Sequence, residues 1–580
     1  MEFNLKSDHG KFCSAEDGGG NEGQVVDGRP AGLLTATRDS AGGWETFLGE
    51  WNEDGTFSLR AKDTNKALCC ENADADSDAD RDGVLVFNRD NVGTWEKFYL
   101  WTDDEGRVSF ESVARPKYFI KVWPTGSVSL SRAFADNQPV DEPGGYEKFV
   151  ADPPITSAGV PTGGPLDPVW GPVRLDDELF YDGRGPLVPI GMHFGEAFSA
   201  FCRGKGDVER QLSVAVAAGY DHHRVWGNLG YYESWRGREV AFTSFTGRDG
   251  QHVPATPDYY AKVDRYHQLC QKVGIRAVWD QGDMNSMSHS AITGHQKQIR
   301  QIADKYPVVS MAYALANEKW QNFPEDIAKD ENWAVSCMTA AWGSSPFITI
   351  NSCPPGSGES AEEFVKMING FFACNAVHGT RNFGDMEFVM RRFFNYGYER
   401  YPEHYHGKRY GQFSLEPGGP GQGVTVGNTS ETWKIVGMHL ATLIGRSAIE
   451  YMSGRGVYWD GPIEEQPGFY EVGKLKSIFV PNSFQFSAYH GNRGEAWFTS
   501  TYGFADKGEG YGRVDQLISD NFRKGYCIAH SGKGRRQITS RRTCDVKVYD
   551  LALREKFDLK VTAGIPFDVQ GDAFFVANLV

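Results

Sequence analysis

The first 150 residues contain a short motif that recurs at a constant interval. Its copies are GWETF, TWEKF and GYEKF, and their aromatic residues Trp44, Trp95 and Tyr146 follow one another at equal spacing. Each copy closes a segment that opens with alternating apolar and polar residues, and Gly, Asn and Asp separate the runs. Alternation with period two and such turn residues predict short strands joined by hairpins. Three copies therefore predict a threefold all-β barrel. We expect the Trp and Phe of each copy in its core, with a role in binding as the alternative.

The same residues resemble a known module. LKSDHGKFCSAEDGGG, LTATRDSAGGWETF and LVFNRDNVGTWEKF are similar to the fascin-like β-trefoil, which is often appended to bacterial carbohydrate-active enzymes. We therefore predict a fascin-like β-trefoil over residues 1–150. Trefoils bind sugars, actin or nothing known, so this fold alone gives no function. The segment 151–168, ADPPITSAGVPTGGPLDP, is rich in Pro and Gly and predicts a semi-rigid linker.

Charge limits the class of partner. The formal net charge is −16, from 60 Lys and Arg against 76 Asp and Glu. Nucleic acids and anionic membranes attract basic surfaces, so we expect neither as a partner. Separately, we expect the protein to be a monomer. The aromatic content of 13% indicates either large cores or stacking platforms for sugar rings. The acidic stretch 71–82 is typical of a solvated loop, although its Asp spacing resembles a calcium loop without the central Gly and terminal Glu.

The ten cysteines include no CxxC pair, so we expect neither a zinc site nor a thioredoxin-like motif. Cleavage by two carboxylates, considered below, needs no metal and no organic cofactor, and we expect neither. The N-terminus, MEFNLKSDHGK, lacks a basic segment followed by an apolar core, which leaves no visible secretory signal. A chain trimmed of its signal would look the same. We expect an extracellular protein, with a cytoplasmic or virion-associated location as the alternative.

Residues 169–488 have a different pattern, in which short apolar runs alternate with longer helical segments. The eight runs are PLVPIGMHF, YDHHRVWGN, GIRAVWDQ, VVSMAYALANE, PFITINS, FFACNAVHG, RYGQFSLE and AIEYMSGRG. Several intervening helical segments end in Gly, as helices often do. Eight strands with helices between them predict a parallel (β/α)8 TIM barrel.

Catalytic groups of such barrels lie at the C-terminal ends of the strands. Two glutamates follow predicted strands four and seven, Glu318 and Glu416. Glycosidic cleavage needs one carboxylic acid to protonate the leaving oxygen and a second carboxylate to attack the anomeric carbon or activate water. Because strands four and seven lie across the barrel mouth, both side chains can converge on one sugar ring.

These strand ends resemble glycoside hydrolase clan A, the cellulase-like barrels. ALANEKW (314–320) is similar to the Asn-Glu signature of the fourth strand, and FSLEPGGPG (413–421) to the seventh-strand glutamate. The resemblance implies that Glu318 is the acid/base, that Asn317 holds the 2-hydroxyl and that Glu416 is the nucleophile.

Further positions of the clan match less specifically. The resemblance implies that Arg224 orients the nucleophile, that His378 is the sixth-strand histidine and that Trp459 is the eighth-strand aromatic platform. His223 and Asn228 after the second run, and Asp283 after the third, are further candidates for substrate binding. The third run ends in WDQGD, where family 5 cellulases commonly have His, and the sixth lacks a His-x-Tyr pattern. The resemblance therefore indicates the clan and no single family.

Each candidate has an ordinary alternative. Glu416 precedes Pro417 and can be a turn residue, in which case Glu403 and Glu450 are its nearest rivals. Glu450 can be an inward-facing barrel residue. His222 and His223 can be structural, and Asp283 can cap a loop.

Residues 489–580 return to alternation, in runs such as EAWFTSTYGF, DVKVYDLALREKFDLKV and DAFFVANLV, and predict a small β-sandwich. The whole sequence predicts a retaining β-glycoside hydrolase that cleaves a polysaccharide or oligosaccharide, endo-acting rather than exo-acting. The alternatives are an inactive carbohydrate-binding or adhesion protein and a phage-associated polysaccharide depolymerase.

Overall fold

The structure is a computed structural model of the whole chain. It describes residues 1–52, 56–71, 83–102, 107–115, 118–135, 138–140, 143–153, 155, 164–176, 179–204, 208–229, 240–246, 250, 252–284, 287–315, 331–343, 345–352, 374–378, 411–415, 431–452, 462–489, 496–500, 514–529 and 535–580. The chain divides into two compact units, formed mainly by Met1–Val160 and by Pro161–Phe198, Gln211–Glu233 and Glu239–Val580. The acidic stretch lies almost entirely outside the described residues.

The first unit consists of strands and short 3₁₀ turns. Its strands are β1 (Glu2–Ser7), β2 (Phe12–Ala15), β3 (Val25–Val26), β4 (Arg29–Pro30), β5 (Leu34–Arg38), β6 (Thr46–Trp51), β7 (Phe57–Ala61), β8 (Ala67–Glu71), β9 (Val84–Arg89), β10 (Phe98–Thr102), β11 (Val108–Ser112), β12 (Tyr118–Val122), β13 (Val128–Ala135), β14 (Gln138–Val140) and β15 (Phe149–Asp152). All but β3 and β4 belong to one antiparallel sheet.

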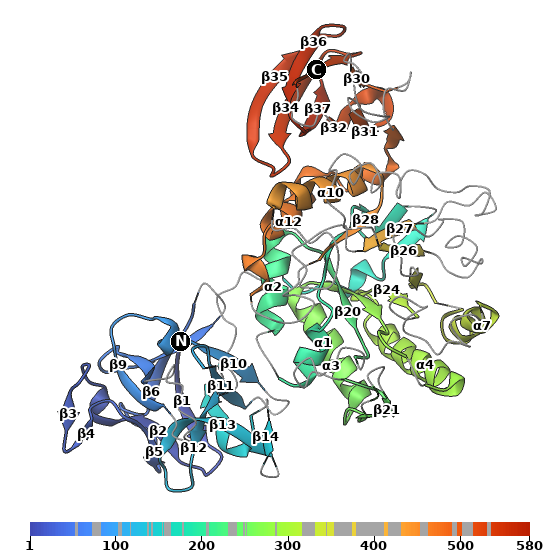
Figure 1. Cartoon of the computed structure of the whole chain (residues 1–580). Helices are drawn as coiled ribbons and strands as arrows, with labels where there is room; N and C mark the ends of the chain where they lie inside the picture. Colours follow the sequence, from blue (N-terminus) through green and yellow to red (C-terminus); the bar gives the residue numbers. More distant parts are fainter. Residues whose placement is uncertain are drawn as a thin grey trace. The chain divides into compact units, whose positions relative to one another are not determined.

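The two ends of this unit meet within that sheet. The first strand, β1, pairs with the last, β15, with Asn4 opposite Asp152 and Ser7 opposite Phe149. Residues 1–152 therefore close on themselves around one apolar core (Figure 1). The predicted all-β character of this unit is confirmed, while the assignment to the trefoil family stays a prediction.

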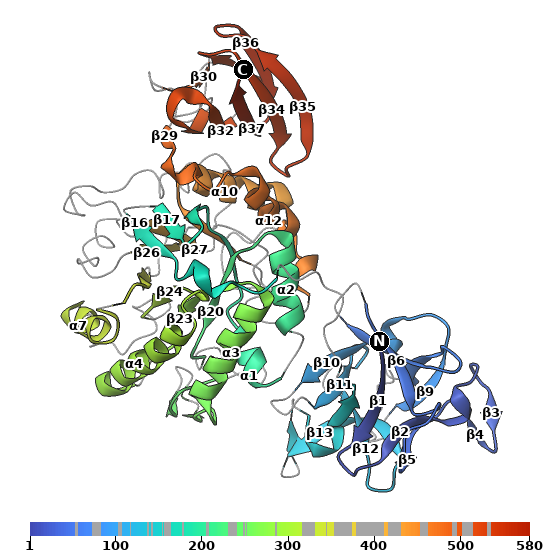
Figure 2. The same cartoon turned by 180° about the vertical axis from the view of Figure 1, so that it is seen from behind.

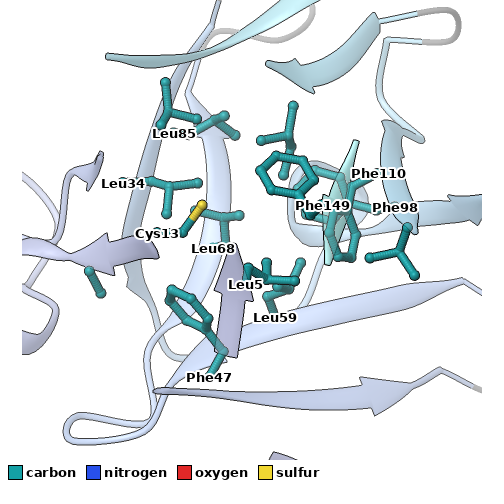
Figure 3. Packing of buried hydrophobic residues seen from close by; sticks show 14 of the residues in the cluster. Leu5, Cys13, Leu34, Phe47, Leu59, Leu68, Leu85, Phe98, Phe110 and Phe149 are labelled. Atoms are coloured by element: carbon teal, nitrogen blue, oxygen red, sulfur yellow. The ribbon is translucent and has the colours of Figure 1, made fainter. Parts of the chain in front are cut away.

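The recurring motif builds the same local structure in each copy. Each motif forms a tight turn followed by a strand, namely β6, β10 or β15. The phenylalanines Phe47, Phe98 and Phe149 that start these strands are fully buried, and Figure 3 shows them among Leu and Cys side chains of the core. The core prediction for Phe is confirmed.

The glutamate of the motif is buried as well. Glu45, Glu96 and Glu147 are all less than 10% exposed. Glu45 Oε2 accepts the Gly42 N–H at 2.8 Å, and Glu96 Oε2 accepts the Gly93 N–H at 2.7 Å. A carboxylate that accepts a backbone N–H three residues earlier stabilises the turn and satisfies a donor that the turn leaves unpaired.

The core prediction for the aromatic residue of the motif was wrong. Trp44 is 39% exposed, Tyr146 is 41% exposed and Trp95 is half-buried. The turn directs the following Glu inward, so the residue before it points outward.

The second unit contains a closed barrel of eight parallel strands. They are β19 (Ile190–His193), β20 (His222–Trp226), β23 (Arg276–Asp280), β24 (Ser310–Ala314), β25 (Ile348–Ser352), β26 (Cys374–His378), β27 (Gly411–Leu415) and β28 (Ala448–Met452). Each of the eight runs expected from the sequence contains one of these strands. The barrel closes where β19 pairs with β28, with Gly191 opposite Glu450.

Helices surround these strands. They are α1 (Ala197–Cys202), α2 (Val208–Ala218), α3 (Tyr259–Val273), α4 (His289–Lys305), α7 (Glu331–Trp342), α10 (Thr432–Ile444) and α12 (Phe469–Ile478). In both views α3 and α4 lie side by side outside the barrel (Figures 1 and 2). The connections after β25 and β26 lie outside the described residues, so the eightfold repetition of the helix stays a prediction.

Small sheets flank the barrel along the chain. Before β19 lie β16 (Arg174–Asp176), β17 (Leu179–Asp182) and β18 (Gly185–Leu187), and after β20 lie β21 (Phe245–Thr246) and β22 (His252–Val253). The C-terminal strands are β29 (Ser487–Tyr489), β30 (Phe498–Ser500), β31 (Val514–Ile518), β32 (Lys524–Ala529), β33 (Arg535–Ser540), β34 (Cys544–Asp550), β35 (Glu555–Val561), β36 (Pro566–Gln570) and β37 (Ala573–Leu579).

The C-terminal strands form two antiparallel sheets of six and three strands. Phe498 of the smaller sheet meets Phe575 of the larger edge to face, with ring centroids 5.0 Å apart. Both belong to one apolar cluster, as expected for a β-sandwich. Among the described helices, none is long and apolar enough to cross a membrane.

The contrast within the repeat gives a stability prediction. Phe47→Ala removes a fully buried ring and should cost about 3–5 kcal/mol, whereas Trp44→Ala removes a partly exposed ring and should cost much less. The free energy of unfolding of this unit can be measured separately in the full chain, from the exchange of the backbone amides of residues 46–51 at increasing urea concentration. Equal losses of protection in the two variants would contradict the core described for this unit.

Candidate functional site

The candidate site is built on the C-terminal ends of the barrel strands. Side chains of a barrel strand alternate between the barrel interior and the helix layer. In β20 this alternation separates three neighbouring residues. His222 and Arg224 point inward, and His223 points toward α3.

Arg224 and Asp280 form a fully buried ion pair between β20 and β23. The Arg224 Nη2–H donates to Asp280 Oδ2 at 2.7 Å, and Nε–H donates to the same oxygen at 3.2 Å. Asp280 Oδ1 accepts the Gly282 N–H at 2.9 Å. The guanidinium is therefore held in one orientation at the end of the second strand, where the sequence predicts a residue that orients the nucleophile. Asp280 is a partner that sequence reasoning noted only as a polar strand end.

His193 of β19 adjoins this ion pair. Its Nδ1 lies 3.4 Å from Arg224 Nη1, and its ring meets Trp226 edge to face with centroids 5.1 Å apart. Sequence reasoning missed His193, although it ends the first predicted strand just as Arg224 lies near the end of the second. A stricter search of every strand end would have found it.

His223 has a structural position. Its Nδ1–H donates to the Arg276 carbonyl at 2.9 Å, and its Nε2 accepts the Tyr266 O–H of α3 at 2.7 Å. Both ring nitrogens are thus engaged in holding α3 against β20. Burial lowers the pKa of His223 to about 3, so the ring is neutral. The structure does not support the prediction that His223 binds substrate.

Asn228 and Asp283, two of the residues predicted to bind substrate, lie in contact. The Asn228 side-chain amide donates to the Asp283 carbonyl, and the Asp283 N–H donates to the Asn228 carbonyl at 3.1 Å. Both residues are buried, and Asn228 Oδ1 has no partner among the described residues. These contacts tie the loop after β20 to the loop after β23.

Gln281 is a further polar residue at this end of the barrel that the candidate list omits. Its Oε1 accepts the His295 Nε2–H at 2.5 Å and the Trp279 Nε1–H at 3.3 Å, which fixes the amide. Its buried Nε2 has no partner in the described part of the chain. His295 belongs to α4, and burial lowers its pKa to about 3. Its contact with Gln281 joins segments that are distant in the sequence, so no local pattern predicts it.

The remaining candidates are only partly described. β24 ends at Ala314 and β27 ends at Leu415. Asn317, Glu318, Glu416 and Trp459 lie outside the described residues. His378 is the last residue of β26, and its backbone is paired with Leu415.

Glu450, the rival nucleophile, is described and lies deeper in the barrel. It is fully buried in β28, level with Gly191 and His222, and its Oε1 is 3.8 Å from His222 Nε2. Arg224 lies two residues further along β20, toward the mouth. A Cβ on Gly191 would lie 2.1 Å from His222 Nε2, so the His222 ring fills the space between Gly191 and Glu450. Glu450 is thus an inward-facing barrel residue below the candidate site.

Among the described residues, no group of three or more His, Cys, Asp and Glu side chains is arranged to hold a metal ion. His222 and His223 in particular point to opposite sides of β20.

Comparisons with known proteins add only a likeness of fold. No protein-family model and no curated protein sequence matches the chain. A glycoside hydrolase family 5 structure from Bacteroides vulgatus has 13% identity, covers 72% of this chain and 95% of that chain, and gives a TM-score of 0.47. A family 30 subfamily 8 xylanase from Clostridium acetobutylicum has 10% identity, coverage of 68% and 96%, and a TM-score of 0.39. The designed protein ThreeFoil has 16% identity, covers 26% of this chain and 96% of that chain, and gives a TM-score of 0.21. At these scores the likenesses carry no argument about chemistry.

The Arg224–Asp280 pair gives a stability prediction. Asp280→Ala leaves a buried guanidinium without its carboxylate and should cost about 3–5 kcal/mol, measured by urea denaturation of the full chain. Asp280→Asn keeps an acceptor and should cost less. Glu555→Ala, which breaks the exposed Lys547–Glu555 pair, is the control and should leave the midpoint unchanged. A tolerated Asp280→Ala would show that the pair does not hold Arg224.

Buried neutral histidines give a pH prediction. Burial lowers the pKa of His223 and His295 to about 3 and of His267 and His439 to about 4, against about 6.5 in the unfolded chain. Below pH 6.5 the unfolded chain binds protons that the folded chain does not, so the free energy of unfolding should fall between about pH 6.5 and pH 4. Above about pH 6.5 the four histidines are neutral in both the folded and the unfolded chain, so they no longer make the free energy of unfolding depend on pH.

The variant His267→Leu isolates one of these groups. In that pH window the variant should take up about one proton fewer on unfolding, so the free energy of unfolding should depend less steeply on pH. At pH 8 the slope should not change. An unchanged slope below pH 6.5 would contradict the neutral state of His267.

Proposed function

We propose that the chain is a retaining β-glycoside hydrolase that cleaves a polysaccharide. The observation that carries the proposal is the order of the closed parallel barrel. Its fourth strand, β24, leads into Asn317-Glu318 after Leu315-Ala316, and its seventh strand, β27, leads directly into Glu416. Two carboxylates that follow two strands of one barrel, three positions apart in the ring, are the minimum set for glycosidic cleavage.

In the first step of this proposal Glu318 protonates the leaving glycosidic oxygen while the Glu416 carboxylate attacks the anomeric carbon. The glycosidic bond breaks and an ester to Glu416 forms. In the second step Glu318 takes a proton from water, the hydroxide attacks the same carbon and Glu416 leaves as a carboxylate. Two inversions give net retention, which requires the carboxyl groups to be about 5–5.5 Å apart.

The proposal requires different charge states for the two glutamates, with Glu318 protonated and Glu416 ionised. Arg224, whose guanidinium is fixed by Asp280, is proposed to lie beside Glu416, because a neighbouring cation favours the ionised nucleophile. Asn317 is proposed to hold the sugar 2-hydroxyl, Trp459 to stack on the ring, and His378, Asn228 and Asp283 to bind further hydroxyls. Gln281, with its unpaired buried Nε2, is added to this set.

The proposed substrate class also indicates where the protein acts. A polymer cannot enter a cell unaided, so action on a polysaccharide implies an extracellular enzyme. Endo action and the monomeric state are proposed with it.

The nucleophile assignment has a direct chemical test. Glu416→Ala should abolish turnover of activated aryl β-glycosides, and azide should restore it with a glycosyl azide of inverted configuration as product, because azide occupies the space of the missing carboxylate. Glu318→Ala should keep activity on substrates whose leaving group needs no proton. Glu403→Ala is the matched control and should retain full turnover. Normal turnover in Glu416→Ala or Glu318→Ala would refute the assignment.

A further inference from the structure

Two of the three aromatic residues of the N-terminal repeat are exposed at equivalent places. Trp44 and Tyr146 each precede a buried glutamate, Glu45 and Glu147, and each is about two-fifths exposed. A single exposed aromatic side chain is ordinary on a protein surface. An exposed aromatic side chain that recurs at equivalent turns, each time before a buried glutamate, is less ordinary and suggests a shared role.

The first position combines Trp44 with a free carboxylate. A Cβ on Gly18 would lie 3.2 Å from Trp44 Nε1 and 3.4 Å from Asp63 Cβ, so the indole and Asp63 flank the same glycine. Gly18 has a φ of +71°, and the Thr64 O–H donates to its carbonyl at 2.8 Å, which holds the hairpin beside the ring. Within the described residues, neither the Trp44 indole N–H nor the exposed Asp63 carboxylate has a partner.

The second position repeats this arrangement with Tyr146. Its ring centroid lies 4.7 Å from that of His9, and a Cβ on Gly145 would lie 3.4 Å from Asp8 Oδ2. Asp8 and Asp63 occupy the same place in the hairpins SDHGK and KDTNK. Across the described part of the chain the Asp8 carboxylate and the Tyr146 hydroxyl also have no partner. Each position thus presents an exposed ring beside an unpaired carboxylate.

The third position differs in the group that it presents. Equivalent backbone bonds, Lys62 N–H to the Thr46 carbonyl and Val113 N–H to the Lys97 carbonyl, begin the second and third hairpins at the same point of the motif. The third hairpin has Ala114 in place of Asp63. The guanidinium of the next residue, Arg115, lies 3.8 Å from the Tyr118 ring and donates to the Tyr118 hydroxyl at 3.1 Å. Trp95 is half-buried, so this position offers neither a free ring face nor a free carboxylate.

We propose that the Trp44–Asp63 and Tyr146–Asp8 positions bind neutral sugar rings of a glycan. One face of a sugar ring is a row of C–H groups that packs on an aromatic ring, while hydroxyls at its edge donate to a carboxylate. The same carboxylate repels uronic acids and sulfated sugars, so the glycan is neutral. Two such positions on one unit bind separate stretches of one polymer and raise its apparent affinity. This binding is independent of the chemistry proposed for the barrel.

The test is electrophoresis of the full chain in native gels that contain a soluble polysaccharide. The neutral polymers are mixed-linkage β-glucan, galactomannan and arabinoxylan, and the acidic polymer is polygalacturonate. The chain should be retarded by at least one neutral polymer and not by polygalacturonate. Trp44→Ala, Tyr146→Ala and Asp63→Asn should each raise the dissociation constant about ten-fold, and the double variant Trp44→Ala/Tyr146→Ala should raise it further than either single variant.

Two control variants separate this proposal from general effects. Trp433→Ala removes an indole of nearly equal exposure, 37%, on α10 of the other unit, and Trp95→Ala removes the third aromatic residue of the repeat. Both should bind as the unaltered chain does. Staining the gel for polysaccharide after the run shows whether the polymer is intact, so the binding result is read independently of the catalytic assignment.

Three results would overturn the proposal. They are the absence of retardation by every neutral polymer, retardation that the double substitution does not weaken, and retardation that Trp433→Ala abolishes. Asp63→Asn removes no ring and keeps the size of the side chain, so it tests the first position even if an aromatic substitution disturbs the turn.

Discussion

Closure of the parallel barrel is the constraint on which the site depends. The pairing of β28 with β19 completes a ring in which each strand lies beside two others, and side chains must then alternate between the interior and the helix layer. That alternation brings Arg224 to Asp280 and directs His223 away from both. It also brings His222 against Glu450 in a lower layer, below the strand ends that form the candidate site.

Much of the architecture could be predicted because it follows from local patterns. Eight apolar runs gave eight strands, and the recurring GWETF motif gave an all-β unit with Phe47, Phe98 and Phe149 in its core. Strand ends are also local features, which is why β26 ends at the predicted His378. The pattern within a strand did not say which of His222 and His223 faces inward, because the two are adjacent and equally polar.

Contacts between distant segments could not be read from the sequence. The neutral His295 of α4 donates a hydrogen bond to Gln281, and the Tyr266 hydroxyl of α3 donates one to the His223 ring. The outward position of Trp44 likewise depends on the buried Glu45 that follows it, and an aromatic residue in a repeat is otherwise expected in the core. In each case a partner on another element, or a turn, decides where the side chain points.

The central claim is that Glu416 is the residue that bonds covalently to the sugar. It is tested most directly with 2-deoxy-2-fluoro β-glycosides that carry a dinitrophenyl leaving group, in the gluco, manno, galacto and xylo series and their disaccharides. The fluorine slows both formation and hydrolysis of the glycosyl-enzyme, and the dinitrophenyl leaving group speeds formation alone. The ester therefore accumulates, and mass spectrometry of the digested protein locates it. The account predicts a single label on the peptide that contains FSLEPGGPG, attached to Glu416. A label on Glu403 or Glu450, or no label with any reagent, would contradict it.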